Sequence, residues 1–456
     1  MASGVRQLRW GIVGCGLISS DMIKAIKLLP HNEHEIVAVA ARALDRAQAF
    51  ALEHGVDNAK AYGTYDELFA DPNVEVVYIG LLNHQHKSAV LTALDCGKHV
   101  LCEKPLALNV KETREMVEKA RSKKLFLMEG YWSRFFPVWK QVKSEVQQKT
   151  IGDVNIMQCD FGFMKHAENK MSLAMGGGNL MATGCYPIMF ALSIFGVERP
   201  ELIAAMGFHS SHTPDGESIK ERLLCPDGGG GVLMAVGTYG VLLAVTLFQE
   251  APVAVSATAL YFQENAGNSD NEINKRLLNK EEGGGLAVDI GCYPTQLSLL
   301  VFGGERPEQI SAVGWQRGNH GVDDTASVTL KFSGNRMAQL LYTGSSDTIC
   351  QGQICGSKGR LHIPNFLWCP DTLIKYTSQP EPNTEKKHYP VPTQEGLKFH
   401  YSNSGGLSYE AAAVRDCIIN GLTECPDMTL DETLIIAEIL QEIRRQLGVK
   451  YPQDDE

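Results

Sequence analysis

Apolar runs and amphipathic stretches alternate along the first 150 residues of the 456-residue chain. Several runs are apolar throughout, which is typical of strands covered on both faces in a parallel sheet. Their repeated strand–helix order predicts a doubly wound α/β domain. The expected strands are Leu8–Val13, Ile36–Ala41, Val74–Ile79, His99–Cys102 and Leu125–Met128, and the expected helices are Ser20–Leu29, Leu44–Glu53, Lys87–Cys96, Lys111–Lys123 and Pro137–Gln148.

The pattern changes after Ile151-Gly152-Asp153, where strand-like runs and glycine clusters replace most of the helical stretches. This predicts a second, α+β domain with a largely antiparallel sheet. The second part also contains a repeat, because residues 176–208 and 283–315 are identical at 17 of 33 positions without gaps. A sheet-plus-helix unit is therefore expected to occur twice. A gene model that joins two alternative exons would produce the same repeat, and this explanation stays open.

Composition excludes several classes of partner. The formal net charge is −11 and no basic block is present, so nucleic acid is not expected to bind. The longest apolar stretch, residues 231–248, is interrupted by glycine and threonine, and the first nine residues have no apolar segment. Neither a membrane span nor a secretory signal is expected. The twelve cysteines form no CxxC pair, which favours reduced thiols in a cytoplasmic protein without a bound metal.

A glycine-rich turn lies between the first strand and the first helix, with the sequence Gly14-Cys15-Gly16-Leu17-Ile18. Gly14 permits a tight turn, and Gly16 lets phosphate groups approach the backbone at the helix N-terminus. The turn predicts a dinucleotide that lies on these five residues. A chance loop can carry the same glycines, but the preceding strand and the following helix favour nucleotide binding.

Two arginines follow the second expected strand. Arg42 stands where NAD-binding proteins usually carry an acidic residue for the ribose 2′-hydroxyl, and Arg46 lies one helical turn on. Guanidinium groups suit a 2′-phosphate, so NADP is the predicted cofactor. The alternative is an ordinary pair of arginines at a helix start.

Polar and aromatic side chains follow the later strands of the first domain. Lys104, in Glu103-Lys104-Pro105, is expected in the crevice beyond the carboxyl ends of the strands, where such sheets bind ligands. Asn83, His86 and Glu103 are expected near the nucleotide. Trp132 and Arg134 belong to an aromatic stretch that suits a pocket wall for a ring-bearing or sugar substrate. The alternative for Lys104, Asn83 and His86 is a solvated surface loop. The alternative for the aromatic stretch is a core patch between the domains.

A further candidate pair lies in the second copy of the repeat. Asp289 and Tyr293 are four residues apart on the expected helix, so both project from one face. A helix-start aspartate beside a core tyrosine would look the same. The first copy keeps Tyr186 but has Ala182 in place of the aspartate, so it lacks one member of the pair. The sequence leaves open which copy lines the active site.

Together these motifs resemble the Gfo/Idh/MocA oxidoreductase family. The resemblance covers the chain except for roughly 100 residues. It implies a Rossmann domain over residues 1–150 and a catalytic and dimerisation domain over residues 255–456, with the extra copy over residues 151–254 as the departure from the family. It is carried by residues 8–21, 100–105, 125–129, 132–137, 283–293, 321–325, 355–359 and 407–411.

The resemblance also implies a reaction. We expect NADP-dependent oxidation of a secondary alcohol, either a trans-dihydrodiol of an aromatic ring or an aldose such as D-xylose, by a homodimer with an open-faced sheet. Lys104 and Tyr293 would flank the reacting carbon, supported by Asp289. Tyr293 is the first choice as base, because a cationic Lys104 would lower its pKa.

Several alternatives stay open. Lysine would act as the base if the two roles were reversed. If the site takes a different substrate, the protein is another sugar or inositol dehydrogenase. If it turns over no substrate, the protein is a non-catalytic NADP-sensing regulator. The physiological substrate and the oligomer size are not determined by the sequence.

Overall fold

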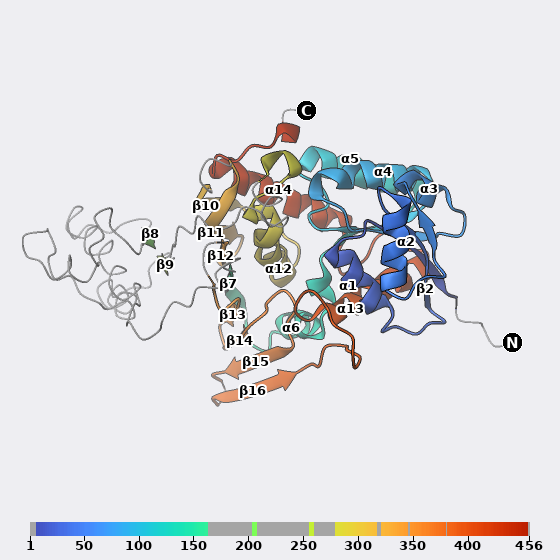
Figure 1. Cartoon of the computed structure of the whole chain (residues 1–456). Coiled ribbons are helices and arrows are strands. Elements are labelled where there is room, and N and C mark those ends of the chain that lie inside the picture. The colour runs from blue at the N-terminus through green and yellow to red at the C-terminus, as the bar shows by residue number, and fades with distance from the viewer. Residues whose placement is uncertain are drawn as a thin grey trace, which may run out of the picture. The chain divides into compact units, whose positions relative to one another are not determined.

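The structure is a computed structural model that describes residues 6–162, 203–207, 255–259, 279–316, 321–344, 347–379 and 381–454. The chain divides into two units by its contacts, and Figure 1 shows the helices and strands of the first. The first unit comprises Met1–Phe161, Asn271–Tyr342 and Ile349–Glu456, and the second comprises Gly162–Asp270 and Thr343–Thr348. All candidate site residues belong to the first unit.

The N-terminal part of the first unit is a six-stranded parallel sheet of order β3-β2-β1-β4-β5-β6. The doubly wound fold is confirmed, and β1 and α2 have the expected bounds. The sequence analysis missed β3 and α3, because elements of three and six residues carry no readable periodicity. The elements are β1 (Leu8–Val13), α1 (Leu17–Ile26), β2 (His34–Ala40), α2 (Leu44–Glu53), β3 (Lys60–Tyr62), α3 (Tyr65–Ala70), β4 (Val76–Ile79), α4 (His86–Asp95), β5 (His99–Glu103), α5 (Val110–Lys123), β6 (Leu127–Gly130) and α6 (Pro137–Gln147).

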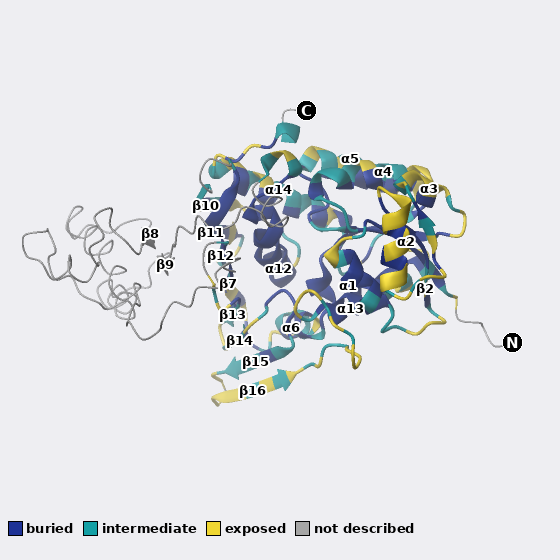
Figure 2. Cartoon of the chain, viewed as in Figure 1, coloured by how far each residue is buried: buried dark blue, intermediate teal, exposed yellow. Residues whose placement is uncertain are grey.

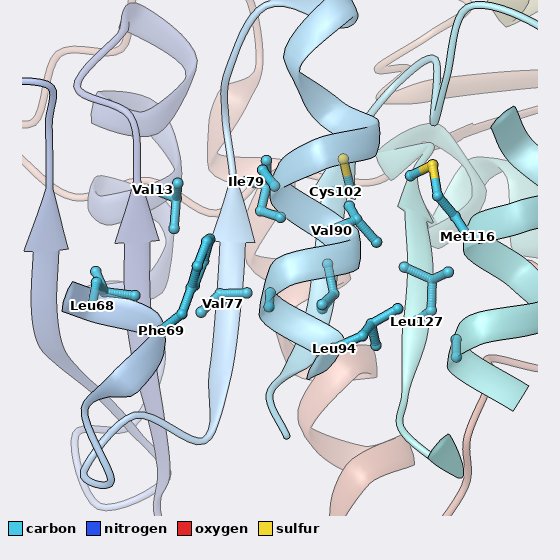
Figure 3. Packing of buried hydrophobic residues seen from close by; sticks show 14 of the residues in the cluster. Val13, Leu68, Phe69, Val77, Ile79, Val90, Leu94, Cys102, Met116 and Leu127 are labelled. Carbon is cyan, nitrogen blue, oxygen red and sulfur yellow. The ribbon is translucent and has the colours of Figure 1, made fainter. Parts of the chain in front are cut away.

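Apolar side chains from strands and helices fill the space on this sheet (Figure 3). Val77 and Ile79 of β4 and Val90 of α4 are fully buried, and Phe69 of α3 is 1% exposed. Each such side chain stabilises the fold by about 1.5–3 kcal/mol through burial. This packing fixes the carboxyl ends of the strands, where the candidate residues begin.

The second sheet of this unit has eight strands in the order β10-β11-β12-β7-β13-β14-β15-β16 and is mostly antiparallel. The predicted α+β part is thus confirmed. Its strands are β7 (Val154–Gly162), β10 (Gln309–Gln316), β11 (Asp323–Phe332), β12 (Arg336–Thr343), β13 (Gly352–Gly356), β14 (Gly359–Ile363), β15 (Thr372–Thr377) and β16 (Asn383–His388).

Strand β7 lies between β12 and β13 in this sheet. It was expected to open the extra copy over residues 151–254, yet it belongs to the sheet formed by the C-terminal part of the chain. The other described stretch of that range is β8 (Ile203–Gly207), which pairs in parallel with β9 (Val255–Ala259) in the second unit. Tyr186 and Ala182 of the first copy lie outside the described residues.

A buried helix follows the glycine cluster Gly283–Gly285. A π-helical turn, Ala287–Gly291, leads into α12 (Cys292–Phe302), and every residue of both segments is buried (Figure 2). The stretch Lys280–Phe302 is long and apolar enough to cross a membrane, but its most apolar window is completely buried, as in the core helix of a folded domain. The remaining helices are α13 (Leu407–Ile419) and α14 (Leu430–Gln446), with short 3₁₀ turns at Asn83–Gln85, Trp132–Phe135, Lys280–Glu282, Ser404–Gly406 and Pro452–Asp454.

Candidate active site

The glycine-rich turn between β1 and α1 has the geometry expected for a nucleotide cradle. Gly14 has φ +95°, and a Cβ at this position would lie 2.8 Å from the Gly80 carbonyl oxygen, so only glycine fits the turn. Gly16 precedes α1, and a Cβ there would meet no atom within 4 Å. The open backbone at Gly16 next to a helix N-terminus fits a dinucleotide pyrophosphate. Cys15 lies between the two glycines, and Leu17 and Ile18 are the first two residues of α1.

Both predicted arginines lie beside the turn. Arg42 and Arg46 are exposed, and Arg46 Nη2 lies 3.4 Å from the Cys15 carbonyl oxygen, to which it donates. Burial raises the pKa of Tyr65, and the charges of Arg42 and Arg46 oppose that rise. Two exposed cations next to the nucleotide turn fit a 2′-phosphate.

The structure brings Lys104, Asp289 and Tyr293 together. Lys104 Nζ donates to the Asp289 carbonyl oxygen at 2.5 Å and lies 3.6 Å from Asp289 Oδ1. The same ammonium lies 4.8 Å from the centre of the Tyr293 ring. Lys104 precedes Asp289 by 185 positions in the sequence, so only the fold brings the lysine to the other two residues.

The π-helical turn determines how Asp289 meets the lysine. The sequence pattern predicts an α-helix with Asp289 and Tyr293 on one face, but Asp289 lies within Ala287–Gly291. A π turn disturbs the usual i to i+4 pairing of backbone groups and often occurs at functional sites. Here the backbone carbonyl of Asp289 accepts a hydrogen bond from Lys104, while the carboxylate forms an ion pair with the same ammonium.

Burial dominates the protonation of the tyrosine. It raises the pKa of Tyr293 well above normal, and the charge of Lys104 only partly opposes this rise. Lys104 thus acts in the expected direction, but burial outweighs it and the net pKa of Tyr293 lies above the ordinary value. Burial also disfavours charge on Lys104, but Tyr293, Cys292 and Asp289 outweigh it and raise its pKa above normal. At neutral pH the pair is a phenol beside an ammonium.

Aromatic side chains enclose Tyr293. Trp132 Nε1 donates to the Tyr293 hydroxyl at 3.3 Å, and the role of Trp132 in binding substrate stays a prediction. Tyr131 and Phe161 contact the Tyr293 ring edge-on, with ring centres 6.3 and 5.5 Å away. The sequence analysis missed Phe161, because β7 carries no motif that distinguishes it from an ordinary strand.

Other candidate residues hold the segments that carry the site. The His86 ring is paired with the carbonyl oxygens of Pro105 at 2.9 Å and Leu81 at 3.2 Å. Asn83 Nδ2 donates to the Gly283 carbonyl oxygen at 3.2 Å. Glu103 accepts a hydrogen bond from the Tyr78 hydroxyl at 2.6 Å. The His86 and Glu103 contacts join the end of β5 to its neighbours, and the Asn83 contact joins the turn before α4 to Gly283. That these three residues bind the cofactor stays a prediction.

Arg134 lies in a different setting from the expected substrate pocket. Its side chain is 2% exposed, and its nitrogens donate to Gln296 Oε1 at 2.6 Å and to the Gln296 carbonyl oxygen at 2.9 Å. It also pairs with Glu432 Oε1 at 3.1 Å and donates to the Asp427 carbonyl oxygen at 3.3 Å. These contacts attach α12 to α14 and the loop before it, so Arg134 is an internal anchor.

Glu129 is a further buried group that the sequence analysis did not assign. Its Oε1 accepts a hydrogen bond from the Leu106 backbone N–H at 2.8 Å, two residues after Lys104. Burial raises its pKa to about 7, although Arg134 and the Leu106 N–H oppose that rise. In the part of the chain that the structure describes, no group of three or more His, Cys, Asp and Glu side chains could hold a metal ion.

Two family descriptions match the chain. Residues 8–131 match the oxidoreductase family with an NAD-binding Rossmann fold, and residues 266–362 match the GFO/IDH/MocA C-terminal domain. Trans-1,2-dihydrobenzene-1,2-diol dehydrogenase from Sus scrofa is 35% identical over 447 residues, covering 98% of this chain and 99% of the relative. The Homo sapiens protein of the same name is 34% identical with the same coverage.

Solved structures share the fold. KijD10, a 3-ketoreductase from Actinomadura kijaniata in complex with NADP, is 17% identical with a TM-score of 0.60 over 96% of this chain and 98% of its own. Aldose-aldose oxidoreductase from Caulobacter crescentus is 18% identical, with a TM-score of 0.64 and coverages of 97% and 98%. A levoglucosan dehydrogenase in complex with NADH is 14% identical, with a TM-score of 0.63 over 97% of each chain.

Proposed function

Because the chain belongs to the Gfo/Idh/MocA oxidoreductase family, which binds NAD(P), we propose that it is an NADP-dependent dehydrogenase of secondary alcohols. The proposed substrates are trans-dihydrodiols of aromatic rings, after the name of its relatives, and aldoses such as D-xylose. One observation carries the proposal. Lys104 Nζ, Asp289 and Tyr293 converge at the carboxyl end of the parallel sheet, where ligands of such sheets bind.

The NADP preference rests on the charge beside the nucleotide turn. Gly14–Ile18 would hold the pyrophosphate, and the exposed Arg42 and Arg46 would pair with the 2′-phosphate. Bound nicotinamide supplies the hydride chemistry, and the protein must position the carbinol carbon and transfer a proton.

Tyr293 and Lys104 have distinct proposed roles. For oxidation the Tyr293 phenol would first release its own proton to water. The phenolate Oη would then accept the hydroxyl proton as the carbonyl group forms and the carbinol C–H bond breaks, its electron pair leaving with the hydrogen as hydride for the bound nicotinamide. Because burial raises the Tyr293 pKa, the phenol is the resting form and is ready to protonate a carbonyl in the reverse direction. Lys104 stays charged and stabilises the phenolate, and Asp289 holds the ammonium in place.

Substitution of the two residues tests the proposal. We expect Lys104→Met and Tyr293→Phe each to lower kcat by about a hundredfold or more, because each removes a group that takes part in proton transfer. Stopped-flow or steady-state NADPH formation with dihydrodiols and D-xylose measures this loss. NADPH fluorescence should show that cofactor affinity is retained.

Tyr186→Phe is the matched control, because Tyr186 is the equivalent tyrosine of the first copy. Its turnover should equal that of the unaltered protein. Loss of activity in Tyr186→Phe, with normal turnover in Tyr293→Phe, would reverse the choice of copy. An unaltered protein that binds NADPH but oxidises no dihydrodiol, aldose or inositol would instead support the NADP-sensing alternative.

A further inference from the structure

We infer that the C-terminal segment Val449–Asp454, together with Arg444 of α14, holds the two catalytic segments of the proposed site in register. This inference rests on the proposed function. The first catalytic segment is Lys104–Asn109, which follows β5, and the second is Gly283–Tyr293, which contains the π turn. The C-terminal segment contacts both, and its residues are not part of the proton-transfer group.

Tyr451 binds the second catalytic segment. Its side chain is almost wholly buried, and its hydroxyl donates to the Gly284 carbonyl oxygen at 2.5 Å, five residues before Asp289. Nearby, Gln453 Nε2 donates to the Glu281 carbonyl oxygen at 3.3 Å. The backbone that leads into the π turn is therefore attached to the C-terminal end of the chain.

Arg444 binds the first catalytic segment. Its Nη2 donates to the Leu108 carbonyl oxygen at 2.9 Å, four residues after Lys104. Asn109 Nδ2 adds a hydrogen bond to the Gln453 carbonyl oxygen at 2.8 Å. The loop that carries the lysine is thus attached to the same C-terminal residues as the segment that carries Asp289.

Contacts within the C-terminal segment make these attachments act together. The Arg444 guanidinium lies 4.0 Å from the centre of the Tyr451 ring and pairs with Asp454 Oδ2 at 2.9 Å. The Tyr451 N–H donates to the same carboxylate oxygen at 2.9 Å. Movement of Tyr451 would therefore shift Arg444 and both catalytic segments.

Apolar packing closes the arrangement. Leu108, Val288, Val449 and Tyr451 form one buried cluster, which includes a side chain from each catalytic segment. A Cβ at Gly283 would clash with the Leu108 side chain, so the two segments are in direct contact. Misplacement of a catalytic group by about 1 Å can slow a reaction about a hundredfold, so this register matters for turnover.

Tyr451→Phe tests the inference, because it removes the hydroxyl and keeps the ring against Arg444. We expect kcat to fall about tenfold, the equivalent of one hydrogen bond, while substrate KM and NADPH affinity change less than twofold. Hydrogen exchange should accelerate at the amides of residues 104–109 and 283–291. Tyr376→Phe is the matched control, since the Tyr376 ring packs on Arg360 in the second sheet.

The exchange measurement separates this inference from the proposed function. Faster exchange at both catalytic segments supports the inference even if no alcohol is oxidised by the unaltered protein, a result that would overturn only the proposed function. Unchanged exchange at both segments, or an unchanged kcat in an active enzyme, would overturn the inference. In a variant that ends at Lys450, hydrogen exchange at the two catalytic segments should accelerate more strongly than in Tyr451→Phe. Faster exchange across the whole protein, without a selective effect at the two segments, would contradict the inference.

Discussion

Tyr293 and Glu129 take their protonation from burial more than from their charged neighbours. Tyr293 stays a phenol despite the nearby ammonium, and Glu129, 2% exposed, has a pKa of about 7. Glu129 and Thr433 line a cavity of about 10 Å³, the smallest space that holds one water molecule. The titratable groups near Glu129 are Tyr131 and Arg134, with the thiols of Cys102 and Cys292 from β5 and α12.

The raised pKa of Glu129 predicts a pH-dependent loss of stability. Its pKa rises from the ordinary 4.5 to about 7 on folding, so the native state holds a proton that the unfolded state releases. The resulting stability is complete below pH 4.5 and is lost as the pH rises through 7, by roughly 3 kcal/mol in total.

Glu129→Gln mimics the protonated form and should remove this contribution to the pH dependence. Urea unfolding of both proteins between pH 5 and pH 8 gives the difference in free energy of unfolding. The glutamine variant should gain stability relative to the unaltered protein as the pH rises. Parallel pH profiles for the two proteins would contradict the assignment.

Among the secondary-structure elements, α12 matters most, because it carries Tyr293 and is buried along its whole length. A helix that is buried along its whole length is held in position by contacts with several neighbouring segments. Arg134 supplies them at Gln296, Glu432 and the Asp427 carbonyl oxygen. The helix position, and with it the proposed catalytic pair, thus depends on a residue from the N-terminal part of the chain.

Arg134→Met should destabilise the protein by about 3 kcal/mol or more, because it leaves Glu432 without its buried cationic partner. Thermal unfolding measures this loss. Arg360→Met, at an exposed position of β14, serves as control and should change stability little. A variant of unaltered stability with a selectively raised substrate KM would instead support the substrate-binding role expected for Arg134.

In the whole molecule, the position of β7 changes where an extra copy could begin. β7 lies between β12 and β13, so the eight-stranded sheet needs residues 154–162. The predicted extra copy covers residues 151–254, of which residues 163–254 follow this strand. The duplication and the homodimer remain proposals, and a shortened chain tests both.

Two deletions should behave differently. Removal of residues 155–254 takes out the central strand β7, and we expect no cooperative thermal unfolding. Removal of residues 163–254 retains β7, and we expect a cooperative transition in a chain that still binds NADPH. Light scattering of the full and shortened proteins gives the oligomer mass, which should be that of a dimer in the full chain. Cooperative thermal unfolding of both deletion variants would show that β7 is not required.

Local features of the chain were enough to predict much of this protein. The alternation of strands and helices, the Gly14 turn and the positions of Lys104, Asp289 and Tyr293 at element ends depend on short stretches of sequence, because periodicity and turn chemistry are local properties. The tertiary structure alone decided the π turn, the high pKa of Tyr293, the anchoring role of Arg134 and the place of β7. Each depends on burial and on partners distant in the sequence, which no short pattern records.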